Sequence, residues 1–491
     1  MNGRNEEDRR IYERSARLIL LLALREAAPQ AKVRFEHSIG RGLYMNVTGM
    51  ELNAAAVRDI ERRMHRIVEK DLPIVRSRWT KQAAMDYFAT CGQEDTVRLL
   101  GYRPFDHFDI YTCDGYSEYF YGDMAGSTGE IRSFALRFYY PGMVLLLPGE
   151  DLDGEPAPFV ERPQLMHTYA LANEHSAILQ CETAADLNDI VSRGEARSFI
   201  RVSEALADRC IAQIADRIIA RGARIVFVAG PSSSGKTTFA NRLSVQLRVS
   251  GKRPVAISLD NYYRNREMIP LDAEGKPDLE CLEAIDVPLF NEQLVDLLAG
   301  HEVQLPVYSF KTKSRESKGI PLRVTQDQIL IVEGIHGLNP ALCEDIPSEL
   351  TFRVYVSALT QLNLDCHNRI RTTDVRLLRR MVRDYRTRHT SVPETMQMWD
   401  SVRAGEEKYI FPYQERADVM FNTSLLYEIA VLKKYAYPML LRIPEDSPYY
   451  VRARRLVKFL NYFVDCSDED EIPPTSILRE FIGGCTFYGN E

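Results

Sequence analysis

The stretch Ile225-Val226-Phe227-Val228-Ala229-Gly230-Pro231-Ser232-Ser233-Ser234-Gly235-Lys236-Thr237-Thr238 decides how the rest of this chain is interpreted. Its first five residues are apolar and predict a short buried strand, and the rest fits the pattern G-x-x-x-x-G-K-[ST]. Two glycines let the backbone turn so that successive N–H groups face one concavity, and the following helix adds the positive end of its dipole. The stretch therefore predicts a strand, a phosphate-binding loop and a helix, rather than a chance glycine turn.

The side chains of this loop indicate a site for ATP. We expect Lys236 to contact the outer phosphates as a point charge and the Thr237 hydroxyl to be a magnesium ligand beside the nucleotide. The loop residues predicted to bind ATP are Gly230, Ser232, Ser233, Ser234, Gly235, Lys236, Thr237 and Thr238.

Length and composition restrict the class of protein. A chain of 491 residues is too long for one typical core, so two or more domains are expected. The net charge of -7 argues against a general nucleic-acid or membrane-surface binder. Nine cysteines without a C-x-x-C pair indicate reduced thiols, the apolar run at 18–24 is too short to cross a bilayer, and residues 4–10 are unlike a signal peptide. We predict a cytoplasmic protein.

Beyond the loop, strand and helix patterns alternate, which predicts an α/β domain with a mainly parallel sheet. The candidate strands are residues 254–259, 329–333, 351–356 and 418–422. Ligands of such sheets collect at the carboxyl ends of the strands, where Asp260 and Glu333 follow two of these runs. Asp260 is predicted to be the general base, with a turn cap as the alternative, and Thr237, Glu333 and Asp260 form the predicted metal site.

An arginine-rich segment covers residues 368–389. Its arginines are Arg369, Arg371, Arg376, Arg379, Arg380, Arg383, Arg386 and Arg388. A helix so rich in arginine can close over a triphosphate and stabilise charge during transfer, so we predict a lid; the alternative is a solvated helix face.

Six motifs in order make residues 230–419 resemble the uridine kinase and phosphoribulokinase group of phosphate-loop kinases. They are the loop, Ser258-Leu259-Asp260-Asn261-Tyr262-Tyr263, Pro306-Val307-Tyr308-Ser309-Phe310, Ile331-Val332-Glu333-Gly334-Ile335, residues 374–384, and Ala417-Asp418-Val419. The resemblance implies that Asp260, Lys236 and Arg383 are catalytic, and that Arg380, Arg383 and Arg388 contact the donor phosphates. It also implies an acceptor site of Tyr263, Glu280, Tyr308, Phe310, Lys313 and Arg315.

Two departures leave the acceptor open. The family's pyrimidine-contacting histidine is replaced by Lys313, and its ribose-binding acidic position falls at Glu280 or Glu283 in an altered segment. An ammonium donates to a carbonyl but cannot accept a hydrogen bond. A nucleoside is therefore expected, while a more acidic or phosphorylated acceptor would suit Lys311 and Lys313 equally well.

Residues 1–150 predict an α+β domain: a helix at 7–27, strands at 32–36 and 42–47, and a helix at 53–70. The motif Phe35-Glu36-His37-Ser38-Ile39-Gly40-Arg41-Gly42-Leu43-Tyr44 and the helix after it resemble the second N-terminal domain of threonyl-tRNA synthetases, an editing-domain relative. The family's H-x-x-x-H pair is replaced by Arg14 and Leu18 and its later histidine by Ser117, so the resemblance implies a dismantled hydrolytic site that keeps only His37 and Cys113. Tyr111, Tyr116, Tyr119 and Tyr121 are interpreted as core residues rather than as base-stacking ones.

The predicted division is residues 1–150 for the synthetase-like domain, 151–200 for a linker with helices, 201–425 for the kinase-like domain and 426–491 for a C-terminal helical extension. We expect an ATP- and Mg²⁺-dependent kinase that phosphorylates the 5′-hydroxyl of a nucleoside such as uridine. The alternatives are a kinase for another hydroxylated metabolite, such as a phosphosugar or a pantothenate-like compound, and a nucleotide-dependent RNA-binding regulator. No membrane partner is expected, nucleic acid only through the N-terminal domain, and a homo-oligomer stays open.

Overall fold

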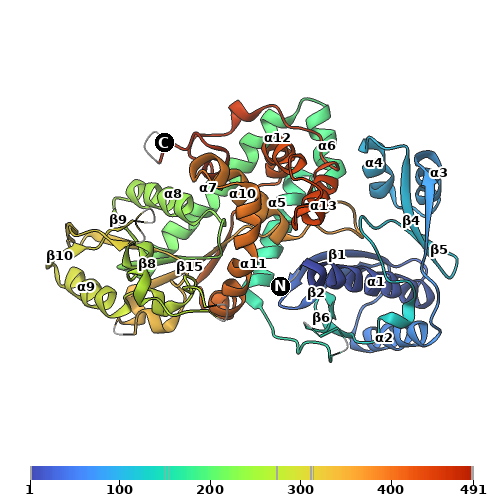
Figure 1. Cartoon of the computed structure of the whole chain (residues 1–491), viewed down its shortest axis with the longest axis horizontal. Helices are drawn as coiled ribbons and strands as arrows, with labels where there is room; N and C mark the ends of the chain where they lie inside the picture. The colour runs from blue at the N-terminus through green and yellow to red at the C-terminus, as the bar shows by residue number, and fades with distance from the viewer. Residues whose placement is uncertain are drawn as a thin grey trace.

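The computed structural model describes residues 3–149, 151–152, 154–272, 275–309, 312, 314–344 and 346–487. It begins with α1 (Gly3–Ala27), which shares a hydrophobic core with an antiparallel sheet and α2 (Ala54–Glu69) (Figure 1). The four strands lie in the order β1 (Lys32–Ile39), β2 (Gly42–Thr48), β7 (Gly142–Leu146) and β6 (Ala135–Tyr139). The predicted α+β fold of this part is confirmed.

The helix α2 shows how sequence fixes an element here. The Asn53 side chain accepts hydrogen bonds from the N–H groups of Ala55 and Ala56, both at 3.0 Å, and so caps the helix start. The buried positions of the helix are Val57, Ile60, Met64 and Ile67. Their spacing of three and four residues places them on one face, and each contributes about 1.5–3 kcal/mol by leaving water.

A second, three-stranded antiparallel sheet follows, with two helices. Its elements are β3 (Val75–Thr80), α3 (Lys81–Thr90), α4 (Glu94–Tyr102), β4 (His107–Cys113) and β5 (Tyr116–Glu118). Tyr111, Tyr119 and Tyr121 are buried, and Tyr119 shares a hydrogen bond with Tyr462 near the end of the chain. The core interpretation of these three tyrosines is confirmed.

Three helices lead to the kinase-like sheet: α5 (Pro163–Leu179), α6 (Ala184–Ser192) and α7 (Ala196–Arg221). The last ends at Gly222, whose φ of +71° is the left-handed conformation that glycine adopts at a helix C-terminus. The predicted division at residue 200 falls inside α7, so one continuous helix spans both sides of it.

The five-stranded sheet is wholly parallel. Its order is β16 (Val419–Asn422), β15 (Thr351–Ser357), β8 (Ile225–Ala229), β14 (Gln328–Glu333) and β9 (Arg253–Ser258). All five residues of β8 are buried, because this central strand is covered on both faces. The prediction of a mainly parallel sheet is confirmed.

Helices flank this sheet, and α10 and α11 stand between it and the N-terminal part (Figure 1). The remaining elements of this region are α8 (Lys236–Val249), α9 (Val287–Ala299), β10 (Glu302–Leu305), β11 (Tyr308–Ser309), β12 (Ser314–Arg315), β13 (Ile320–Arg323), α10 (Thr372–Thr387) and α11 (Val392–Tyr409). Within the described ranges, no helix is long and apolar enough to cross a membrane.

The C-terminal helices are α12 (Glu428–Leu441), α13 (Tyr450–Leu460) and α14 (Arg479–Ile482), and they share a hydrophobic core with the parallel sheet. Asp374 of α10 joins both ends of the chain, since it pairs with Arg10 of α1 at 3.0 Å and with Arg455 of α13 at 2.6 Å. The described residues after 426 are thus part of the packed body of the molecule.

Candidate active site

The phosphate loop joins the end of β8 to the start of α8 in a conformation that requires its glycines. A Cβ atom on Gly230 would lie 1.9 Å from the Val356 carbonyl oxygen of the neighbouring strand. Gly235 has a φ of +83°, and a Cβ atom there would also lie 2.6 Å from Ile477. Any larger residue at either position would force backbone or core atoms apart, so both positions require glycine.

Two acidic residues meet the loop at the neighbouring strand ends. Glu333 ends β14, and Asp260 lies two residues beyond the end of β9, in a short 3₁₀ turn. The Thr237 hydroxyl donates to Glu333 Oε2 at 3.4 Å, and the Ser258 hydroxyl donates to Oε1 at 3.2 Å. The order β8, β14, β9 therefore brings the loop, Glu333 and Asp260 to one edge of the sheet.

Burial and mutual charge shift the pKa values of these groups. Burial lowers the pKa of Lys236, while Glu333 and Asp260 oppose that shift. Burial and the Asp260 carboxylate raise the pKa of Glu333 to about 7, and burial raises the pKa of Asp260 against the pull of Lys236 and Arg388. Two carboxylates here share the nearest lysine, so a further cation would stabilise both of them.

Thr237 and Glu333 fit a magnesium site that is completed by a nucleotide. In the part of the chain that the structure describes, no group of three or more His, Cys, Asp or Glu side chains converges as metal ligands. Magnesium binds through one or two protein oxygens together with phosphates and water. The Thr237 hydroxyl and the Glu333 carboxylate, whose oxygens lie 3.4 Å apart, can supply these oxygen ligands.

Three arginines of the predicted donor site surround Asp384. Arg380 lies 3.2 Å, Arg383 2.7 Å and Arg388 3.8 Å from its carboxylate oxygens. Arg380 also donates from Nη1 to the Ser232 hydroxyl at 2.7 Å, which brings this cluster directly to the phosphate loop. These arginines thus lie beside the loop, where their positive charge would stabilise the negative charge of a bound triphosphate.

The first half of α10 corrects the prediction of an arginine lid. Arg376 pairs with Glu406 of α11 and Arg379 with Glu428 of α12, and both arginines are at most 1% exposed. Arg369, three residues before α10, likewise pairs with Glu13. These arginines are neutralised by glutamates inside the core, so this part of the helix is neither a lid nor a solvated face.

On the acceptor side, the Tyr263 and Tyr308 rings lie together with centroids 5.5 Å apart. Arg315 donates to the carbonyl oxygens of Tyr263 and Tyr262 at 2.9 and 2.8 Å and pairs with Asp286 at 3.1 Å. Its guanidinium therefore holds the loop that carries Asp260. Two further predicted acceptor residues, Phe310 and Lys313, lie outside the described residues.

Glu280 belongs to the same charged group. Burial and Glu406 raise its pKa to about 7, and Arg380 and Lys236 oppose that shift. The side chain packs on α11, since a Cβ atom on Gly405 would lie 2.5 Å from Glu280 Cβ. The structure thus brings Glu280 near the loop.

Two carboxylates that no sequence motif indicated bind the loop. The Glu480 carboxylate of α14 accepts hydrogen bonds from the Thr238 hydroxyl at 2.6 Å and from the Thr238 N–H at 3.3 Å. Glu406 accepts from the Ser232 N–H at 3.1 Å. N–H groups of such a loop and of the first turn of its helix are where phosphates bind, so both carboxylates occupy phosphate-like positions. Neither lies in a motif that could have indicated this.

Comparison with known proteins assigns this region. Residues 225–429 match the model of the phosphoribulokinase / uridine kinase family. These residues form a phosphoribulokinase / uridine kinase family domain. Uridine kinase of Lactobacillus helveticus is 29% identical over 197 residues, which cover 40% of this chain and 84% of that protein. Uridine kinase of Staphylococcus haemolyticus is 27% identical over the same length, with 86% of that protein covered.

Solved structures also resemble the kinase domain. A possible uridine kinase from Bacillus stearothermophilus has a TM-score of 0.31 and 21% identity over 43% of this chain and 97% of that chain. D-glycerate 3-kinase from Cryptococcus neoformans has a TM-score of 0.24 and 16% identity over 54% of this chain and 89% of that chain.

The family domain makes this protein a small-molecule kinase, an ATP-dependent phosphotransferase that acts on an alcohol group. The match leaves residues 1–224 outside it. The resemblance of the N-terminal part to threonyl-tRNA synthetases stays a prediction. Its two remaining residues lie in different surroundings: His37 stacks on Tyr169 of α5, whereas Cys113 is buried in the core of α1 and α2.

Proposed function

We propose that the kinase domain transfers the γ-phosphoryl group of ATP to the 5′-hydroxyl of a nucleoside such as uridine. The observation that carries this proposal is the position of Asp260, a carboxylate of raised pKa beside Lys236 at the edge of the sheet that holds the phosphate loop. A carboxylate of raised pKa is a stronger base than an ordinary aspartate.

In the proposed step, Asp260 accepts the proton of the acceptor hydroxyl while its oxygen forms a bond to the γ-phosphorus. The bond from that phosphorus to the bridging oxygen breaks, and ADP carries away the electron pair. Lys236 and the arginines around Asp384 stabilise the charge on the phosphoryl oxygens. Magnesium, held by Thr237 and Glu333, would neutralise phosphate charge when bound.

The acceptor assignment is supported by the named uridine kinases and by the side chains next to Asp260. The paired rings of Tyr263 and Tyr308 offer an aromatic surface, and Glu280 offers a carboxylate that can accept hydrogen bonds from ribose hydroxyls. Lys313 favours a second candidate, a phosphorylated or acidic alcohol, because it replaces the histidine that contacts the pyrimidine in the family.

ADP release from the purified protein, measured with uridine, cytidine, adenosine, a phosphosugar and pantothenate, tests this proposal. We expect turnover with a pyrimidine nucleoside, and its loss by about 10²–10⁴-fold in Asp260→Asn, which removes the base. ATP binding should persist in that variant, and Asp296→Asn, at a half-exposed position on α9, serves as the charge-matched control. Turnover of the phosphosugar alone would favour the second candidate, and no turnover with any alcohol would contradict both.

A further inference from the structure

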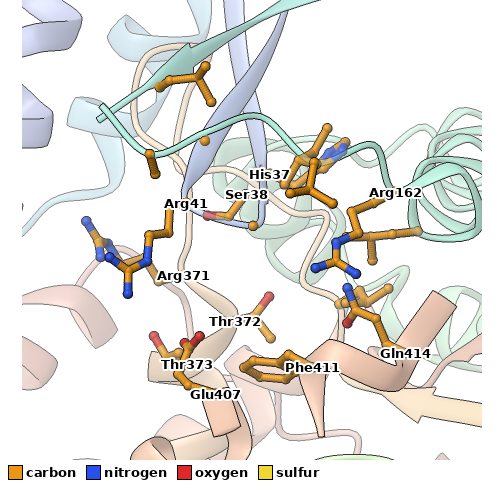
Figure 2. A pocket seen from close by; sticks show the side chains of 18 of the residues that line it. His37, Ser38, Arg41, Arg162, Arg371, Thr372, Thr373, Glu407, Phe411 and Gln414 are labelled. Atoms are coloured by element: carbon orange, nitrogen blue, oxygen red, sulfur yellow. The ribbon is translucent and has the colours of Figure 1, made fainter. Parts of the chain in front are cut away.

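A cavity of about 890 Å³ lies where the N-terminal part meets the kinase domain (Figure 2). Its walls come from the β1–β2 turn, α5, the residues that begin α10 and the end of α11. None of the residues assigned above to phosphoryl transfer lines it. The volume is within the range of about 300–1,000 Å³ that small-molecule sites occupy.

Positive charge dominates this cavity. Six arginines line it, Arg41, Arg162, Arg369, Arg371, Arg376 and Arg403, against the three carboxylates Asp151, Glu155 and Glu407. Among the residues that the structure describes, neither Arg41 nor Arg162 has an ion-pair partner, and Arg162 Nε also has no hydrogen-bond partner. These two guanidinium groups are therefore available to an anion from outside the chain.

Other donors face the same space. Thr372 and Thr373 form the start of α10, where backbone N–H groups and the helix dipole favour negative charge. Figure 2 shows Arg41 and Arg371 on one side of the cavity and Arg162 on the other. The Thr360 hydroxyl, in a side chain that is 6% exposed, has no hydrogen-bond partner in the described ranges. Phosphate oxygens accept hydrogen bonds from donors that have no other partner.

The cavity also has aromatic walls, since Phe411, Tyr169 and Tyr355 line it. A ligand that combines a planar ring with phosphate groups would use both kinds of wall. We propose that this cavity binds a nucleoside phosphate at a site separate from the phosphate loop. This inference holds whichever alcohol the kinase domain phosphorylates.

The site is connected to the loop through Arg376. This residue lines the cavity, donates from Nε to the Ser232 carbonyl oxygen at 3.0 Å, and pairs with Glu406. Glu406 in turn accepts from the Ser232 N–H. A phosphate in the cavity would compete with Glu406 for Arg376 and for Arg403, so its binding should change the affinity of the loop for ATP.

Isothermal titration calorimetry with UMP, UTP and inorganic phosphate tests the site. We expect the double variant Arg41→Gln/Arg162→Gln to bind the nucleotide at least tenfold more weakly, about 1.4 kcal/mol, at the cavity. Binding there should persist in Lys236→Ala, in which the loop is impaired, and in Arg58→Gln, an exposed arginine of α2 outside the cavity. With no ligand present in the cavity, the double variant should keep wild-type kinase turnover.

Four outcomes would overturn the inference. Unchanged nucleotide binding in the double variant would remove the cavity as the site, and complete loss of binding in Lys236→Ala would assign all nucleotide to the loop. Equal affinity for inorganic phosphate and UMP would contradict a nucleoside ligand. Binding of a short single-stranded RNA, with none of the small probes bound, would assign the surface to nucleic acid instead.

Discussion

Replacing Glu480 by glutamine should tighten ATP binding. Its carboxylate accepts from the hydroxyl and the N–H of Thr238, in the first turn of α8, where a nucleotide phosphate would also accept. Any phosphate that takes the Thr238 N–H must first displace this carboxylate or lie beside it. Both arrangements cost free energy, because both groups are anions.

The expected size of the effect follows from these contacts. Hydrogen bonds to a charged group are worth about 1.5–3 kcal/mol, and two unit charges about 5 Å apart in a partly buried site repel by about 3 kcal/mol. The amide introduced by Glu480→Gln would keep a carbonyl oxygen as acceptor for Thr238, so only part of this free energy is released. We therefore expect the Kd for ATP to fall by at least tenfold, about 1.4 kcal/mol.

Equilibrium titration with ATP, together with the KM for ATP in the ADP-release assay, measures this change. Asp446→Asn, at an exposed position between α12 and α13, removes the same charge away from the loop and should leave the Kd unchanged. An unchanged or larger Kd in Glu480→Gln would show that the carboxylate supports the nucleotide site instead of competing with phosphate.

Three further predictions concern ion pairs between distant parts of the chain. Asp374→Asn should lower the free energy of unfolding in urea by about 3–5 kcal/mol, because it leaves Arg10 buried with a lost partner; a smaller loss than about 1 kcal/mol would contradict this. Burial raises the pKa of Glu6, but Arg10 and its neighbouring arginines lower it further, and the result is a pKa of about 2. The ion pairs of Glu6 therefore stabilise the fold above pH 4.5, and this stabilisation is lost as the pH falls toward 2. Melting curves at successive pH values would detect the loss. Burial lowers the pKa of His367, but the Glu118 carboxylate raises it further, and the result is a pKa of about 9. The ion pair of His367 with Glu118 therefore stabilises the fold fully below pH 6.5, and this stabilisation is lost as the pH rises through 9. The variant His367→Gln should remove this dependence of stability on alkaline pH.

Local sequence was sufficient for the sheet and for its ligand-binding edge. The apolar run at 225–229 and the loop after it could be predicted because a fully buried strand is continuously apolar and the positive φ of Gly235 is a conformation that glycine adopts without strain. The parallel arrangement then places the residues after β9 and β14 at the same edge, which is why Asp260 and Glu333 could be predicted together.

The arginines of α10 show where that reasoning fails. Composition marks the helix as cationic, but whether an arginine is buried or free depends on partners that lie far along the chain. Glu406 is 30 residues from Arg376, and Glu428 is 49 residues from Arg379. Both glutamates belong to helices whose packing on α10 is a tertiary property, so periodicity alone could not distinguish a core ion pair from a lid.

Two carboxylates from outside its own strand and helix accept hydrogen bonds from the phosphate loop. Glu406 satisfies the N–H of Ser232 and is fixed by arginines that line the cavity, whereas Glu480 satisfies the N–H of Thr238 and lies on a helix of four residues. A buried N–H requires an acceptor, and these two have one before any nucleotide binds. If phosphate replaces Glu480, ATP binding and displacement of the Glu480 carboxylate from Thr238 are one equilibrium. Linkage then requires that any change which holds this carboxylate more tightly on Thr238 weakens ATP binding by the same factor by which ATP weakens that hold.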